Sequence, residues 1–517
     1  MFQCMDSSAR VAGFKICGFR TASRPNGFLM TNHMQPAFDD QHNRRVFLRQ
    51  SSLGIGSIAA AWLLKQEGVL AKPPSVVATQ QTYDLLPKQT HFEPTAKAMI
   101  SLFQHGGPSH MDLTDPKPEL TKFDGTEYKG DVAYSFVNAA SKKLLGTRWK
   151  FRKQGQCGTE LSELLPHTGE IADDICLIRS MHTGANGHEV SIRYFHSGIP
   201  GVLGRPHYAS WLLYGLGSET HDLPSYMVLT DPGGHPVDST NNWSSGFMPP
   251  LFQGTVLRPK EPRILNLEPP TYLKGEPQRQ NLQLLQSLNR RHADRFPQEA
   301  DLDARIASYE LAARMQTSAT EALDISKETK ATQDLYGINN DATREYGTRC
   351  LIARRLVERG VRFVQLFLAG QPWDNHSDIT TGLPAICRRT DQPSAGLVKD
   401  LKQRGMLDET IVHWGGEIGR LPVTQDQGNA SKHGRDHNGQ GFSIWFAGGG
   451  FKPGMVYGAT DELGHRAVEN IVTPNDYQAT LFKLFGLDWN KLIYHHGGQP
   501  QLVTAGRAAR VVDEILA

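Results

Sequence analysis

The sequence contains little cysteine. It has 6 cysteines in 517 residues, and two of them, Cys4 and Cys17, lie close to the N-terminus. The other four are scattered without C-x-x-C spacing: Cys157, Cys176, Cys350 and Cys387. This pattern speaks against a zinc knuckle and against a disulfide framework, although one disulfide stays open. We expect most of these cysteines to be buried apolar side chains.

A strong net charge is also missing. The formal charge is +2, and no run of lysine and arginine with interleaved aromatic residues occurs. The sequence therefore does not predict a nucleic-acid partner. Its composition, with 39% hydrophobic and 21% charged residues, is that of a globular protein, while 50 glycines and 30 prolines predict many long loops.

The chain has no apolar run long enough for a stable transmembrane helix. Residues 44–64 read RRVFLRQSSLGIGSIAAAWLL, in which paired arginines and a polar step precede a short apolar segment. This layout is typical of a twin-arginine export signal. An amphipathic surface helix would need polar residues at helical spacing after Leu53, and the segment does not supply them. We expect the twin-arginine machinery to export the chain to the periplasm or beyond, with cleavage or retention as an anchor left open.

After a linker that ends near residue 91, the sequence alternates apolar strands with helical segments, which predicts a doubly wound α/β domain over residues 92–517. The expected strands begin at residue 97 and continue at residues 175–178, 225–229, 361–368, 410–414 and 442–446. The expected helices cover residues 161–172, 207–216, 342–359, 394–404 and 474–484. Residues 283–336 are charged and helical, and predict a helical insertion.

Ligand-type residues gather next to these strands, in four pairs: His105 and Asp112, Asp374 and His376, Glu417 and Arg420, Asp436 and His437. Strand ends of an open parallel sheet meet at one edge, where ligands bind. Imidazole nitrogen with carboxylate oxygen is the donor set for zinc, manganese or a similar divalent ion. Any single pair is as well explained by a surface ion pair. The recurrence at successive strands favours a metal site.

Spacing separates the pairs. Asp374 and His376 lie two residues apart, so an extended backbone points both side chains the same way, as two ligands of one metal require. Asp436 and His437 are adjacent and diverge if extended. Either a turn brings both to the metal, or Asp436 orients the imidazole of His437 from outside the ligand set. Arg420 fits two roles, a clamp on an oxyanion or a structural partner of Glu417.

Four motifs together resemble a known family: FQHGGPSHMDLTDPKP, WDNHSD, GGEIGRLP and GRDHNGQGFSIWFAGGGFKPGMVYGATDELGHRAVEN. They are similar to the secreted bacterial domain-of-unknown-function family 1501, over residues 92–517. That family resembles sulfatases and the alkaline phosphatase superfamily. The resemblance implies a mostly parallel sheet with helices on both faces and one or two divalent ions, with zinc or manganese expected and calcium or magnesium left open.

The sequence departs from the superfamily's pattern of metal ligands. Where an aspartate usually follows the first strand, the chain has Gln104 and His105, so Asp112 would have to serve from further along the loop. Glu417 stands where the resemblance implies an Asp-His pair. For the nucleophile, the loop MHTGANGH after the second strand offers Thr183 as the first choice, and a loop with a purely structural role is an equal alternative. No Cys-x-Pro-x-Arg motif is present, which speaks against a formylglycine mechanism.

These expectations combine into an exported metal-dependent hydrolase of phosphate or sulfate esters, acting on a small-molecule or polysaccharide ester. The alternative is a non-catalytic exported protein that keeps the same fold and binds carbohydrate or another partner. An isomerase or transferase on the same fold stays open.

Overall fold

The computed structural model describes residues 84–517 except 133–134, 136–139, 266, 268–269, 297–299 and 426–432. The chain divides into two compact units, Met1–Ala78 and Thr79–Ala517, and the described residues all belong to the second. The predicted export signal at residues 44–64 therefore lies outside the described residues. No described helix is long and apolar enough to cross a membrane.

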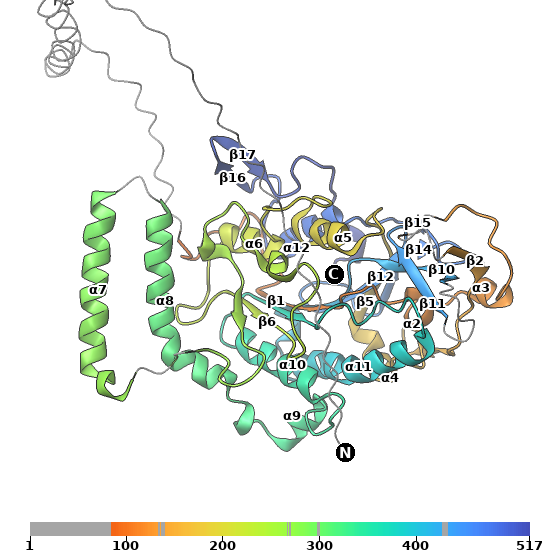
Figure 1. Ribbon diagram of the computed structural model, residues 1–517, viewed down its shortest axis with the longest axis horizontal. Coiled ribbons are helices and arrows are strands. Elements are labelled where there is room, and N and C mark those ends of the chain that lie inside the picture. The colour runs from red at the N-terminus through yellow and green to blue at the C-terminus, as the bar shows by residue number, and fades with distance from the viewer. Residues whose placement is uncertain are drawn as a thin grey trace, which may run out of the picture. The chain divides into compact units, whose positions relative to one another are not determined.

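An eight-stranded sheet forms the centre of the second unit, in the order β13-β5-β12-β9-β1-β8-β6-β7. Figure 1 labels β1, β5, β6 and β12 of this sheet. Its strands are β1 (Ala98–Phe103), β5 (Ile175–Met181), β6 (Tyr226–Leu229), β7 (Thr255–Leu257), β8 (Phe363–Phe367), β9 (Thr410–Gly415), β12 (Phe442–Ala447) and β13 (Met455–Tyr457). All neighbouring strands are parallel except β12, which runs antiparallel to both β5 and β9. The predicted mostly parallel sheet is confirmed.

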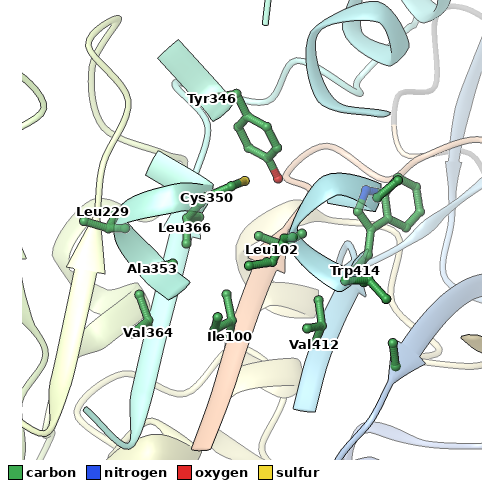
Figure 2. Packing of buried hydrophobic residues seen from close by; sticks show 14 of the residues in the cluster. Ile100, Leu102, Leu229, Tyr346, Cys350, Ala353, Val364, Leu366, Val412 and Trp414 are labelled. Atoms are coloured by element: carbon green, nitrogen blue, oxygen red, sulfur yellow. The ribbon is translucent and has the colours of Figure 1, made fainter. Parts of the chain in front are cut away.

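Strand β1 lies inside the sheet and is covered on both faces. Ile100 and Leu102 belong to one buried cluster, and Met99 and Phe103 belong to another. Figure 2 shows the first cluster, where Ile100 and Leu102 lie beside residues of β8, β9 and α10. This is why the strand reads as a continuous apolar run rather than an alternating one.

Helices cover both faces, as predicted. The first cluster includes side chains of α10 (Arg344–Val357) and α11 (Ile379–Gln403). The second includes side chains of α5 (His188–Ser197), α6 (Tyr208–Leu216) and α12 (Pro474–Leu484). A capping box in which Thr473 and Asp476 exchange hydrogen bonds begins α12 at the expected residue.

One helix prediction was wrong, and another found only the second half of its helix. The expected helix at residues 161–172 is instead the end of β4 (Thr159–Ser162), the short α4 (Pro166–Gly169) and a 3₁₀ turn. The first residues of the expected helix pair as part of β4 with β3 (Phe151–Gln154) instead, and Pro166 starts a new helical turn. The helix expected at residues 394–404 is the second half of α11, which begins at Ile379 and contains two prolines in its interior. Proline normally ends a helix, so the sequence hid this first half.

A second sheet also contributes to the site. It is antiparallel and has three strands, in the order β11-β10-β2. Its strands are β2 (Ala140–Leu144), β10 (Gly419–Gln425) and β11 (Gly434–Asn438). The predicted helical insertion consists mainly of α7 (Glu276–Arg295), α8 (Ala300–Leu323) and α9 (Lys330–Leu335). The remaining elements are α2 (His110–Leu113), α3 (Pro118–Lys122), β14 (Ala459–Thr460), β15 (Ala467–Glu469), β16 (Ile493–His496) and β17 (Gln499–Leu502).

The antiparallel direction of β12 matters for the site. Its first residue, Phe442, pairs with Met181 at the carboxyl end of β5. The start of β12 therefore lies at the same sheet edge as the ends of β1, β5, β8 and β9. In an all-parallel sheet, the segment before β12 would lie at the opposite edge. The reversal brings β11, which precedes β12, to the ligand edge.

Candidate metal centre

Four side chains converge at this edge: His188, Asp374, His376 and His437. Each offers one ligand atom, and these atoms all lie within 4.8 Å of one another. His188 is the first residue of α5, Asp374 and His376 follow β8, and His437 lies on β11 opposite Arg420 of β10. Segments far apart in the sequence thus supply one group.

The ligand atoms have the spacing of a coordination shell. The Nε2 atoms of His376 and His437 are 3.0 Å apart, and they lie 2.9 and 3.0 Å from Oδ1 of Asp374. Nε2 of His188 is 3.3 Å from Oδ2 of Asp374. Bonds of about 2.0–2.1 Å to a tetrahedral zinc ion place neighbouring ligand atoms roughly 3.3 Å apart. The group has the dimensions of a single-ion site.

The three imidazoles present the same nitrogen to the centre. Nδ1 of His437 donates to the carbonyl oxygen of Asn186 at 2.9 Å, and a carbonyl only accepts. Nδ1 of His188 lies 2.6 Å from Oε1 of Glu417, and Nδ1 of His376 contacts Oε1 of Gln425. With Nδ1 donating to these oxygens, Nε2 is the nitrogen that each ring turns toward the centre, where a bound metal would replace any proton that it carries. This pattern of oriented imidazoles is typical of metal ligands.

Asp374 supplies the negative charge of the group. Burial alone would raise its pKa, but Arg420, at 2.5 Å, and the three histidines lower the pKa well below its usual range. Burial works against a charged His188, yet hydrogen bonds to Asp374 and Glu417 raise its pKa to about 9. A divalent ion in this protein therefore has to displace a proton from His188.

Only some of the predicted ligands lie in the four-residue group. Asp374, His376 and His437 belong to the group, while Glu417 lies one contact away, behind His188. Asp436 lies next to His437 on β11, where adjacent side chains point to opposite faces. Its Oδ1 accepts from the backbone N–H of His437 at 2.7 Å and lies 3.8 Å from Nδ1 of His376. Asp436 thus lies outside the four-residue group, but it contacts the backbone of His437, and the imidazole of His437 is held by Asn186 instead.

His105, two residues after β1, and Asp112, on α2, lie outside this group. Asp112 is buried and accepts from Nε and Nη2 of Arg435 at 2.8 and 3.2 Å, and from the Ser109 hydroxyl at 2.6 Å. His105 is buried against the ring of Phe103, and burial lowers its pKa to about 4. Neither residue is in the four-residue group.

Arg420 is 1% exposed, and each of its three nitrogen atoms donates inside the protein. They reach the carbonyl oxygens of Gly106, Gly107 (3.0 Å) and Arg435 (3.1 Å) in addition to Asp374. The structure therefore makes Arg420 a partner of Asp374, whereas sequence reasoning weighed a substrate clamp against a pairing with Glu417.

Thr183, the predicted nucleophile, is 6% exposed in the loop between β5 and α5. Its hydroxyl lies 3.4 and 3.5 Å from the carbonyl oxygens of Ala185 and Gly439, and 3.5 Å from the hydroxyl of Ser191. Those groups are too weakly basic to take its proton.

His188 is the ligand that sequence reasoning missed. It ends the same MHTGANGH loop that was searched only for a nucleophile. The signal used elsewhere, a histidine in a polar loop directly after an apolar strand, was present here. Because the partner acid lies far away in the sequence, no Asp-His spacing drew attention to it.

These features define an α/β protein with a mostly parallel sheet and a candidate divalent-metal centre at its ligand edge. The chain belongs to the family described as protein of unknown function (DUF1501), whose profile matches residues 96–516. The suspected family is confirmed. A search of curated proteins gave no match.

Three solved structures show a weak similarity to this chain. The PsFucS1 sulfatase from Pseudoalteromonas sp. is 11% identical, with a TM-score of 0.34 over 76% of this chain and 68% of that chain. The lipoteichoic acid synthase LtaP from Listeria monocytogenes is 8% identical, with a TM-score of 0.31 over 78% and 76%. The alkaline phosphatase from the Antarctic bacterium TAB5 is 9% identical, with a TM-score of 0.28 over 76% and 98%. Similarity at this level leaves the activity to be argued from the site.

Proposed function

We propose that the protein is an exported metal-dependent hydrolase of phosphate or sulfate esters that acts without a formylglycine. The observation that carries this proposal is the convergence of three Nε2 atoms and one carboxylate oxygen within 4.8 Å of one another. Such a donor set binds a Lewis acid, and a Lewis acid beside a sheet edge is suited to ester hydrolysis. Export rests on the twin-arginine pattern of residues 44–64.

The residues present fit a zinc or manganese ion. Three imidazole nitrogens favour these metals over calcium and magnesium, which prefer oxygen ligands. His188, Asp374, His376 and His437 would hold the ion. When bound, it would polarise an ester oxygen and lower the pKa of a water molecule to about 7.

The chain's own residues position this chemistry. Arg420 holds Asp374 from behind, and Gln371 donates to its Oδ2 at 2.8 Å, so the carboxylate stays ionised and fixed. His376, at 18% the most exposed of the three imidazoles, marks the side from which an ester can approach. Since the contacts of Thr183 include no strong base, a water nucleophile is better supported than the Thr183 hydroxyl.

Turnover and metal content test the proposal together. Purified protein is assayed with aryl phosphate, phosphodiester and aryl sulfate substrates after addition of Zn²⁺ or Mn²⁺. We expect hydrolysis that is lost in His437→Ala and in the double variant Asp374→Ala/His376→Ala, with loss of bound metal. His167→Ala, which changes a 40% exposed histidine of α4, is the matched control and keeps both. Bound metal without turnover on any ester would contradict the hydrolase assignment.

A second candidate is a non-catalytic exported protein that binds carbohydrate or another partner. One observation favours it: Arg420, the arginine beside the centre, is committed to Asp374 and to backbone carbonyls and is not free to hold an anionic substrate. Ester turnover that disappears in His437→Ala would exclude this candidate.

A further inference from the structure

We propose that Glu417 is a positioning residue that holds His188 in the orientation and tautomer the metal centre needs, and is not itself a ligand. The inference rests on the proposed metal centre. Sequence reasoning took Glu417 as a metal ligand and did not assign His188 to the metal. The inference gives both residues different roles.

The imidazole of His188 bridges two carboxylates. Its Nδ1 lies 2.6 Å from Oε1 of Glu417, and its Nε2 lies 3.3 Å from Oδ2 of Asp374. The ring therefore separates Glu417 from the centre. In the part of the chain that the structure describes, the convergent ligand group contains His188 and Asp374 but not Glu417.

Glu417 is itself fixed. It is 0% exposed in the turn between β9 and β10, and its Oε1 also accepts from the backbone N–H of Gly106 at 3.0 Å. Gly106 has a φ of +105°, and a Cβ there would meet the backbone nitrogen of Asp374 at 2.7 Å. Only glycine lets the loop after β1 approach both Glu417 and Asp374 this closely. The carboxylate of Glu417, which accepts from His188, is thus held in place by the backbone of the loop after β1.

The chemical type of this acceptor differs from that of its two counterparts. His437 is held by a backbone carbonyl and His376 by a side-chain amide, whereas His188 is held by a carboxylate. A carboxylate makes the coordinating nitrogen more electron-rich than a neutral acceptor does, and it offsets the charge of a divalent ion. Because Arg420 already balances Asp374, Glu417 supplies a further negative charge beside the centre, in addition to that of Asp436.

Zinc affinity measured by competition with a chromophoric chelator tests this role. Glu417→Gln keeps an acceptor and removes the charge, while Glu417→Leu removes both. We expect Glu417→Gln to weaken Zn²⁺ binding about 10–100-fold, and Glu417→Leu to weaken it further. In the His188→Ala background both changes should have little further effect, within about twofold, because Glu417 acts through His188.

Asp391→Asn is the matched control. Asp391 is another buried carboxylate that accepts backbone N–H groups, those of His167 and Thr168 at the start of α4. Its variant should lose stability and keep the Zn²⁺ affinity. Losses that multiply in the Glu417→Gln/His188→Ala double variant would show Glu417 to be an independent ligand. A Glu417→Gln variant that loses stability but binds Zn²⁺ normally would show a merely structural residue. Either result overturns the inference and leaves the proposed metal centre standing.

Wild-type protein that binds no Zn²⁺ would instead overturn the proposed centre. If the Glu417 variants do not fold, a measurement on the wild-type protein tests the role of Glu417 instead. In zinc-loaded protein labelled with ¹⁵N-histidine, the resonances of His188, identified by their loss in His188→Gln, should show a protonated Nδ1 and a metal-bound Nε2. Metal-bound Nδ1 would contradict the role of Glu417.

Discussion

Replacing Arg420 by glutamine should destabilise the protein strongly, although the change removes no part of the apolar core. Arg420 is 1% exposed and pairs with Asp374, which is 7% exposed, at 2.5 Å. Removing one member of a buried pair takes away the partner of the other charge, which costs about 3–5 kcal/mol. Because the charged His188 still contacts Asp374, we expect the lower end of this range. The carbonyl oxygens of Gly107 and Arg435 lose a charged donor as well.

The control is Arg148→Gln. Arg148 pairs with Asp124 at 2.9 Å but is 50% exposed, so its loss should cost about 0–1 kcal/mol. Urea unfolding of metal-free protein, followed by tryptophan fluorescence, measures both variants. Adding Zn²⁺ should recover part of the Arg420→Gln deficit, because a cation at the centre compensates Asp374 from its other side. Equal costs for the two variants would refute the structural role assigned to Arg420.

Two further predictions concern the pH dependence of zinc binding and the buried pair between Asp112 and Arg435. In metal-free protein the pKa of His188 is raised to about 9, so one proton has to leave before zinc binds; zinc affinity should rise about tenfold per pH unit up to pH 9 and then level off. A flat profile in wild type, or an unchanged slope in His188→Gln, would contradict this linkage. Asp112→Ala breaks the buried pair with Arg435 and should cost about 3–5 kcal/mol in urea unfolding. The same variant should keep zinc affinity within about twofold, and a large loss of affinity would return Asp112 to the ligand set.

The central sheet could be predicted because its strands are buried on both faces and leave apolar runs in the sequence. Strand β8 (Phe363–Phe367) lies inside the run predicted at residues 361–368. The first half of α11 could not be predicted, because its two prolines suggest a break that the surrounding packing overrides. Strand β11 was missed for a different reason: its residues, GRDHN, are polar although all of them are buried.

The candidate site could be predicted where ligands share a short segment. Asp374 and His376 were found from their spacing and His437 from its acidic neighbour, and all three lie in the group. His188 and its contact with Glu417 depend on residues 229 positions apart, which no local pattern reveals. The roles of Arg420 and Asp112 were equally hidden, because their partners, Asp374 and Arg435, are fixed only by the tertiary fold.

Anomalous X-ray diffraction from crystals of zinc-loaded protein tests the central claim most directly. The account predicts one anomalous peak within about 2.0–2.1 Å of Nε2 of His188, His376 and His437 and about 2.0–2.2 Å from an oxygen of Asp374, with Glu417 outside the ligand set. Crystals without a peak at this position, or with the ion bound by other residues, would contradict it.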